Sequence, residues 1–323
     1  MKSLNDSLPP TMSGGRAAGP QASPKDAPKA SGQAAPLRLG LPKGSLEQYT
    51  LALFARSGWR VTLSSRNYFP DIDDPEIVCT LCRAQEMSRY VADGVLDCGL
   101  SGKDWRLENQ SDVEVVADLI YSKATPSSAR WVLAVAGGGP YGQAADLAGK
   151  KISTELPGVT RRWFAERGLK VDVEFSWGAT EAKVVSGLAD AVVEVTETGS
   201  TIKAHGLKII DEILTTHTEL IANRRAFEEP AKKAKIGQLA LLLQGALRAE
   251  GMVGLKMNVR ERDIAAVVAN LPSLNAPTVA HLYQTDWLSV ETVVASKSVR
   301  DLIPALLDSG AEGIIEYPLN KIV

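Results

Sequence analysis

From Leu37 onward the chain alternates short apolar runs with helix-compatible segments, and turns of small or charged residues separate the two. The first half predicts strands over 37–41, 59–64, 76–81 and 94–100, with helices over 46–57 and 85–92. The same alternation then predicts strands over 131–136, 151–154, 171–175 and 191–195, with helices over 159–167 and 179–186. Strands that alternate with helices favour mainly parallel sheets. We therefore expect an α/β fold of two lobes, with a ligand cleft between them.

The C-terminal part has a different pattern. A long Leu- and Ala-rich helix is predicted over 231–251. Beyond it the order is strand, helix, strand, strand, helix, strand, over 253–259, 261–270, 278–282, 287–294, 299–309 and 313–316. This βαββαβ order is typical of a ferredoxin-like domain.

These patterns divide the chain into three regions. Residues 1–36 are rich in Pro, Ala, Gly and Ser, so we expect a disordered extension, with an organellar targeting segment as the alternative. Residues 37–234 form the two-lobed part, with lobe I over about 37–135 and 212–234 and lobe II over about 136–211. Residues 235–323 hold the linker helix and the ferredoxin-like domain.

Composition excludes several classes of protein. The 323 residues are 45% hydrophobic and 23% charged, as in globular proteins, and the net charge of -2 does not favour nucleic acid as a partner. No apolar run is long enough to span a membrane. Cys79, Cys82 and Cys98 are interpreted as free buried thiols rather than as metal or redox groups, which favours a reducing compartment such as the cytoplasm.

One segment carries a specific chemical signal. The apolar run from Asp190 to Thr196 is followed by Glu197 and by the turn Thr198-Gly199-Ser200-Thr201. Hydroxyls and backbone N–H groups at a helix start can bind an anion, and the carboxylates before them can accept hydrogen bonds from sugar hydroxyls. The segment is consistent with a site for a ligand that contains both a sugar and a phosphate. It is equally consistent with an ordinary strand–turn–helix whose helix start is capped.

Cations stand at other helix starts in the same half of the chain. The turns are Pro42-Lys43-Gly44-Ser45, Ser101-Gly102-Lys103-Asp104 and Thr160-Arg161-Arg162. Lysine supplies a point charge for phosphate, whereas arginine can hold it with two hydrogen bonds. Taken together the turns indicate a polyphosphate ligand.

The chain resembles the ATP phosphoribosyltransferase family in its long form, over 37–323. The most specific stretches are 41–45, 97–104 and 188–201, and 220–224 and 274–278 are also similar to the family. The resemblance implies a pentosyltransferase of histidine biosynthesis that joins ATP and phosphoribosyl pyrophosphate (PRPP), uses Mg²⁺ and releases pyrophosphate. It also implies feedback inhibition by histidine and a homo-oligomer between dimer and hexamer.

The resemblance implies roles for individual residues. Thr198, Gly199, Ser200 and Thr201 would hold the 5′-phosphate of PRPP, and Glu194 and Glu197 would face its ribose, with Asp190 nearby. The opposite wall, near ATP or pyrophosphate, would consist of Lys43, Gly44, Arg83, Gly102, Lys103 and Asp104, with Arg161 as a further candidate. No covalent nucleophile and no acid or base is assigned, and no metal ligand is identified.

The C-terminal domain would bind histidine between subunits, near Leu274, Thr278, Gly313 and Asn258. Relatives can carry aspartate where this chain has Asn258, so we expect weaker inhibition. The chain also has Glu194 where relatives often have Asp, Ser45 where they commonly have Arg, and 86–88 Glu-Met-Ser where they commonly have Asp-Ile-Pro.

Two other functions fit the same pattern of elements. The expected two-lobed part is periplasmic-binding-protein-like, so a non-catalytic solute receptor would have the same cleft, although no secretory signal is evident. A regulatory effector-binding protein is the other alternative, although no helix-turn-helix is evident. Release of pyrophosphate would separate the enzyme from both.

Overall fold

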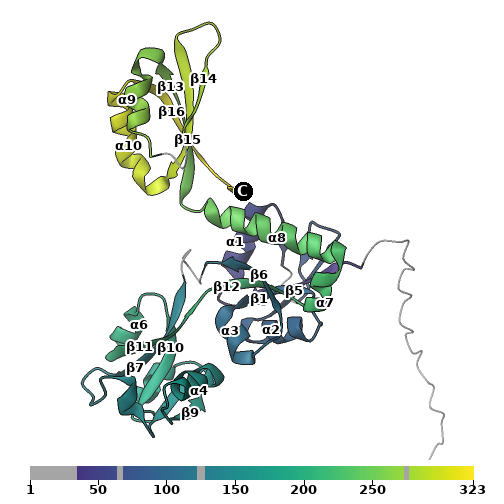
Figure 1. The fold of residues 1–323 in the computed structure, drawn as a ribbon, viewed down its shortest axis with the longest axis vertical. Helices are drawn as coiled ribbons and strands as arrows, with labels where there is room; N and C mark the ends of the chain where they lie inside the picture. Colours follow the sequence, from purple (N-terminus) through teal and green to yellow (C-terminus); the bar gives the residue numbers. More distant parts are fainter. Residues whose placement is uncertain (1–34, 64–67, 122–127, 273–275) are drawn as a thin grey trace, which may run out of the picture. The chain divides into compact units, whose positions relative to one another are not determined.

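The computed structural model describes residues 35–63, 68–121, 128–272 and 276–323, and these fold around three main sheets (Figure 1). The predicted extension therefore lies almost wholly outside the described residues. No described helix is long and apolar enough to cross a membrane. The three cysteines are free and buried, as predicted.

The sheet of lobe I has the strand order β4-β1-β5-β12-β6. Its strands are β1 (Leu37–Lys43), β4 (Ile77–Arg83), β5 (Cys98–Gly102), β6 (Glu114–Leu119) and β12 (Thr218–Ala222). A separate small hairpin joins β2 (Val61–Thr62) and β3 (Asp71–Ile72). The helices are α1 (Glu47–Ser57), α2 (Ala84–Ala92), α3 (Lys103–Asn109), α7 (Arg224–Glu228) and α8 (Pro230–Arg248). β1 runs parallel to β4 and β5, whereas β12 returns antiparallel to β5 and β6.

Both faces of this sheet are covered, which explains the apolar runs of its strands. Apolar residues of α1 and α8 pack with those of β1 on one face, and α2 covers the other face (Figure 1). Gly40 and Gly99 allow α2 to approach, because an added Cβ would lie 2.3 Å and 2.6 Å from the Met87 sulfur. Helix α8, which we assigned to the C-terminal region, thus buries Leu239 and Leu243 in the core of lobe I.

The sheet of lobe II has the order β11-β7-β10-β8-β9. Its strands are β7 (Ala129–Ala136), β8 (Lys151–Thr154), β9 (Asp172–Phe175), β10 (Ala191–Thr196) and β11 (Leu207–Thr216). The helices are η1 (Ala144–Leu147), α4 (Pro157–Glu166), α5 (Thr180–Val185) and α6 (Ser200–Ala204). β8 lies between β9 and β10 and runs parallel to both, and β7 pairs antiparallel with β10 and β11.

The structure corrects the predicted boundary between the lobes. Residues 129–135 and 212–216 were assigned to lobe I, but β7 and β11 are paired with each other in the sheet of lobe II. The chain crosses between the sheets after β6 and again at His217. An apolar run shows that a strand is buried but not which sheet it joins, so the sequence could not place these crossings. β6 was not predicted, and β5 begins at Cys98 and includes Ser101 and Gly102, which we had placed in a turn.

The C-terminal domain is ferredoxin-like, as predicted. Its elements are β13 (Met252–Arg260), η2 (Glu261–Asp263), α9 (Ile264–Ala269), β14 (Thr278–His281), β15 (Trp287–Ala295), α10 (Ser296–Asp308) and β16 (Ala311–Pro318). The strand order is β14-β15-β13-β16 with every pair antiparallel, which is the split βαβ topology. Both helices cover one face of the sheet (Figure 1). Val267 and Leu306 are fully buried in the core.

Candidate functional site

A cavity of about 520 Å³ lies between lobes I and II. Its lining comes from the ends of β1, β4 and β5 in lobe I, from the end of β10 in lobe II, and from the two crossings. The carboxyl ends of parallel strands are the usual ligand-binding edge of an α/β sheet. Nine of the predicted residues line it, namely Lys43, Gly44, Arg83, Gly102, Asp104, Glu197, Thr198, Ser200 and Thr201.

The lobe I wall is cationic. Lys43 and Arg83 are direct neighbours across β1 and β4, so two positive charges end side by side at this edge. The Lys43 ammonium lies 4.1 Å from the ring centre of Tyr68. Arg83 is exposed and makes no ion pair within the described residues. This wall can therefore attract and hold a polyanion.

The lobe II wall is a hydroxyl-rich turn. Gly199 has φ +78°, which a side chain would disfavour, and its N–H donates to the Thr196 hydroxyl at 2.8 Å. The Thr198 and Ser200 hydroxyls lie 2.9 Å apart. The Ser200 N–H donates to the Thr198 hydroxyl at 3.3 Å, and the next amides of α6 have no acceptor within the helix, so these amides and the hydroxyls can donate to an anion. Gly199 itself is buried and shapes the turn without lining the cavity.

Asp104 lines the cavity, and its carboxylate is already hydrogen-bonded by two neighbouring residues. Its carboxylate is buried, one oxygen accepts from the Trp131 indole N–H at 2.8 Å, and the other accepts from the Trp105 backbone N–H at 2.9 Å. Burial raises its pKa despite these hydrogen bonds. A carboxyl already occupied in this way holds the cavity wall in place, and it would repel rather than bind a phosphate.

Glu194 lies beside the cavity rather than in its lining. Burial raises its pKa to about 7, and the neighbouring charges of Glu181 and Glu155 add to the effect. Its backbone position on β10 precedes the hydroxyl turn by only a few residues. A carboxyl with a raised pKa takes up a proton more readily than an ordinary glutamate, and in its ionised form it offers both oxygens as acceptors to sugar hydroxyls.

Besides Gly199 and Glu194, three further predicted residues do not line the cavity. Asp190 accepts from the Lys151 N–H and the Tyr141 hydroxyl at the opposite end of β10, roughly 20 Å from the turn at ~3.3 Å per residue. Arg161 donates to the Val173 carbonyl at 2.7 Å, so it fastens α4 to β9. Lys103 begins α3 next to the cavity but does not line it. Sequence spacing placed these charged residues near the ends of strands. It did not show at which end of a strand, or on which face of a sheet, each side chain lies.

Several lining residues were missed. They are the aromatic residues Trp105, Tyr121 and Trp131, the carboxylate Glu155, and residues 216–218 at the second crossing. Trp105 and Glu155 directly follow turns that we had singled out or strands that we had predicted, so a search of the residues after each strand would have found them. The crossing residues carry no such signal.

In the C-terminal domain, two of the predicted histidine-site residues are neighbours. β16 has an irregularity opposite β13, where Gly313 adopts φ +58° and a Cβ added to it would lie 3.8 Å from the Asn258 side-chain amide nitrogen. Thr278 is exposed on the edge strand β14, two strands away from Asn258. Leu274 lies outside the described residues.

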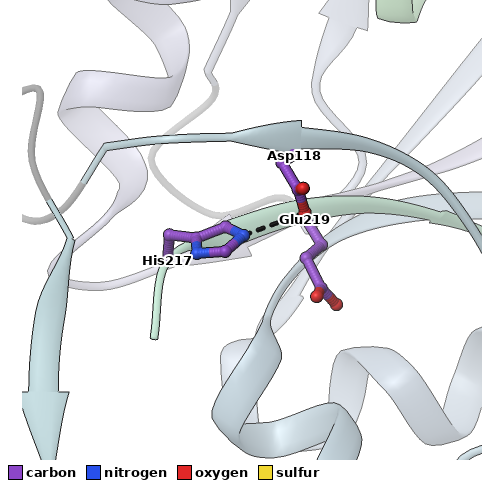
Figure 2. A group of neighbouring side chains, drawn as sticks. All are labelled: Asp118, His217 and Glu219. Atoms are coloured by element: carbon purple, nitrogen blue, oxygen red, sulfur yellow. Dashed lines mark hydrogen bonds and ion pairs between the residues drawn. The ribbon is translucent and has the colours of Figure 1, made fainter. Parts of the chain in front are cut away.

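One cluster in the described part of the chain has the spacing of a metal site. Ligand atoms of Asp118, His217 and Glu219 lie within 4.8 Å of one another (Figure 2). However, His217 is hydrogen-bonded to Asp118 at 2.9 Å, and both Glu219 oxygens accept from Arg106 at 2.6 and 2.9 Å. Mg²⁺ prefers octahedral oxygen ligands, so an imidazole and an arginine-neutralised carboxylate do not fit it.

The fold and the cavity define a class of protein: a two-lobed α/β protein whose cleft suits a phosphorylated ligand with hydroxyl groups. Residues 83–245 match the family model described as ATP phosphoribosyltransferase, and residues 249–321 match that of the family's C-terminal domain. The chain belongs to the ATP phosphoribosyltransferase family. It is accordingly a pentosyltransferase of histidine biosynthesis.

Similar proteins agree with this assignment. An ATP phosphoribosyltransferase of Solidesulfovibrio magneticus is 66% identical over 287 residues, covering 89% of this chain and 98% of that relative. One from Nitratidesulfovibrio vulgaris Hildenborough is 63% identical over 288 residues, with the same coverage. Among solved structures, a chain of the ATP phosphoribosyltransferase (HisG:HisZ) complex of Thermotoga maritima has a TM-score of 0.56 and 27% identity, covering 64% of this chain and 98% of that one.

Proposed function

We propose that the cleft transfers the 5-phosphoribosyl group of PRPP to N1 of ATP and releases pyrophosphate. The observation that carries the proposal is the pairing of two walls in one cavity: Lys43 and Arg83 face a turn built from Thr198, Ser200 and Thr201. Two polyanions must be aligned in this reaction, and cations on one wall with amide and hydroxyl donors on the other can do so.

The chemistry needs no covalent intermediate. Adenine N1 attacks the anomeric carbon while the bond to pyrophosphate breaks, so positive charge grows on the ribose and negative charge grows on the leaving group. Lys43 and Arg83 would stabilise the leaving group. Glu197, which lines the cavity, and Glu194 behind it would accept from the ribose hydroxyls and favour positive charge on the ring. The Thr198–Thr201 turn would hold the 5′-phosphate.

Phosphoribosyltransferases generally require a divalent metal, and we propose Mg²⁺ for this chain. It would enter on the pyrophosphate of PRPP as part of the substrate and screen its charge. The only described cluster with metal spacing does not fit Mg²⁺, so no protein ligand is assigned.

The first experiment mixes purified protein with ATP, PRPP, Mg²⁺ and pyrophosphatase and follows absorbance near the adenine band. We expect a PRPP-dependent rise. If the protein binds PRPP but the absorbance does not rise, the protein would be a two-lobed receptor and not an enzyme. If it does not bind PRPP, the proposal is contradicted altogether.

Replacing Thr198 and Thr201 together by valine is expected to raise the KM for PRPP by about tenfold or more, because two hydroxyl donors to one phosphate are lost at ~1 kcal/mol or more each. The KM for ATP should change much less. Thr62→Val, on the exposed face of the β2–β3 hairpin, is the matched control. Equal increases in both KM values would show that this turn does not hold the phosphate of PRPP.

We further propose that the C-terminal domain binds histidine as a feedback inhibitor, supported by the exposed pair Asn258 and Gly313 on neighbouring strands. Asn258→Asp is expected to lower the inhibition constant for histidine by roughly five- to tenfold, because a charged acceptor strengthens a hydrogen bond to a cationic ligand by about 1 kcal/mol. Inhibition assays at several histidine concentrations measure it. An unchanged constant would remove Asn258 from the site.

The homo-oligomer, between dimer and hexamer, and the cytoplasmic location are part of the same proposal. The buried free thiols are compatible with a reducing compartment. Sedimentation velocity with and without histidine would measure the oligomer.

A further inference from the structure

Helix α3 of lobe I packs Trp105 and Leu107 against the apolar core of lobe II, and its Glu108 carboxylate binds the first turn of α4. One Glu108 oxygen accepts from the Gly158 N–H at 2.8 Å, and the other accepts from the Val159 N–H at 2.7 Å. In return, the Arg162 guanidinium of α4 donates to the Leu107 carbonyl at 2.6 Å. A side chain from one lobe thus caps the first turn of a helix in the other.

The Glu108 carboxylate fits closely against the N-terminal end of α4. The first N–H groups of α4 have no partner within the helix, and the positive end of the helix dipole favours a negative charge there. Gly158 leaves room for that charge, because an added Cβ would lie 3.0 and 3.1 Å from the two Glu108 oxygens. Since Glu108 already occupies this helix end, the end is not available to a phosphate of the substrate.

Helix α3 also carries part of the cavity wall. Arg106 holds α3 to lobe I through both oxygens of Glu219, which lies on β12. Asp104 and Trp105 line the cavity, and Asp104 reaches lobe II through the Trp131 indole and the Thr216 hydroxyl. The attachment of α3 to α4 therefore helps to set the distance between the two walls of the cavity.

We propose that Glu108 is a positioning residue that holds the two lobes in the arrangement able to bind substrate from both sides. The inference rests on the proposed function only for its consequence for substrate. Without the carboxylate, the open arrangement gains population, and the apparent affinity for a ligand that bridges the lobes falls in proportion to the lost population.

The direct test is Glu108→Gln, which keeps the size of the side chain but removes its charge and one acceptor oxygen. Hydrogen exchange at the Gly158 and Val159 amides should become about tenfold faster or more. Glu166→Gln, at the exposed C-terminal end of α4, is the matched control and should leave exchange of the Gly158 and Val159 amides unchanged. Unchanged exchange in Glu108→Gln would overturn the proposal.

The second readout is the separation of the lobes. Spin labels on Arg89→Cys and Lys170→Cys, both exposed, report the distance between them by pulsed electron resonance. In ligand-free Glu108→Gln the distance distribution should broaden relative to the unsubstituted protein, and PRPP with Mg²⁺ should narrow it again. An unchanged distribution would contradict the proposal.

Binding and kinetic measurements distinguish a positioning role of Glu108 from a loss of folded protein. In Glu108→Gln the dissociation constant of PRPP, measured by calorimetry, should rise about tenfold while kcat at saturation stays within about twofold, because bound substrate restores the closed arrangement. A merely structural role would lower kcat with an unchanged dissociation constant.

A second variant keeps the test decisive if Glu108→Gln folds poorly. Gly158→Ala leaves Glu108 in place and crowds its carboxylate from the opposite side, so it should produce the same changes in exchange and distance. If the unsubstituted protein does not bind PRPP, the proposed function fails, but exchange and distance still decide the role of Glu108.

Discussion

Replacing Arg83 by alanine is expected to lower kcat/KM by about 100-fold or more, since charge-assisted hydrogen bonds to the departing pyrophosphate contribute ~3 kcal/mol in the transition state. Arg83 stands at the carboxyl end of β4 and lines the cavity beside Lys43. It makes no ion pair within the described residues, so its removal leaves no buried charge unpaired. Steady-state kinetics with each substrate varied in turn would measure the effect.

The controls for this prediction separate charge from geometry. Arg83→Lys retains the charge but not the planar pair of donors, and it should fall between the alanine variant and the unsubstituted enzyme. Arg89→Ala, on the exposed face of α2, should have little effect. If Arg83→Ala retained full kcat/KM, the cationic wall would have no part in the reaction and the assignment of ATP or pyrophosphate to lobe I would fail.

Asp97→Asn is expected to lower the free energy of unfolding by about 3 kcal/mol, because it breaks a buried charge network from one side. Asp97 is only 2% exposed. Its carboxylate accepts from the Arg38 backbone N–H at 2.9 Å, from the Arg38 guanidinium at 2.7 Å and from the Lys232 ammonium at 3.3 Å. The group thus ties β1 and α8 to the segment that enters β5.

The effect of Asp97 should depend on pH with a definite sign. Burial alone would raise its pKa, but hydrogen bonds and charge from Arg38, with help from Lys232, lower the pKa below the ordinary 3.8. The carboxylate therefore stabilises the fold fully above about pH 4 and loses that contribution as the pH falls further. Denaturant unfolding of both proteins at pH 7 and near pH 3 should show the difference shrinking in acid.

Asp112→Asn supplies the matched control. Asp112 also pairs with an arginine, Arg224, at 2.7 Å, but its side chain is 80% exposed. An exposed ion pair contributes about 0.5 kcal/mol, so its loss should be small at every pH. A comparable loss in the two variants would show that burial of Asp97 does not set the size of its contribution.

Much of the architecture was readable from residue patterns. The alternation of apolar runs and helices predicted two α/β lobes, and the βαββαβ order predicted the ferredoxin-like domain, since both depend on local periodicity. Turns with small or charged residues after strands identified Lys43 and Thr198 as candidates, and the resemblance to the family added Arg83. Lys43 and Arg83 meet because the carboxyl ends of the parallel strands β1 and β4 lie at one edge of a sheet, whereas Thr198 comes from the other sheet and lines the same cavity through the arrangement of the two lobes.

The sequence by itself determined most of the strands and helices, where turns can donate to an anion, and, through its motifs, the family. Only the tertiary structure decided that β7 and β11 join lobe II, that Asp190 lies at the far end of β10, and that Glu108 caps a helix of the other lobe. The reason is physical. Periodicity and turn chemistry act over a few residues, whereas sheet membership and contacts between lobes depend on pairings between residues that are far apart in the chain.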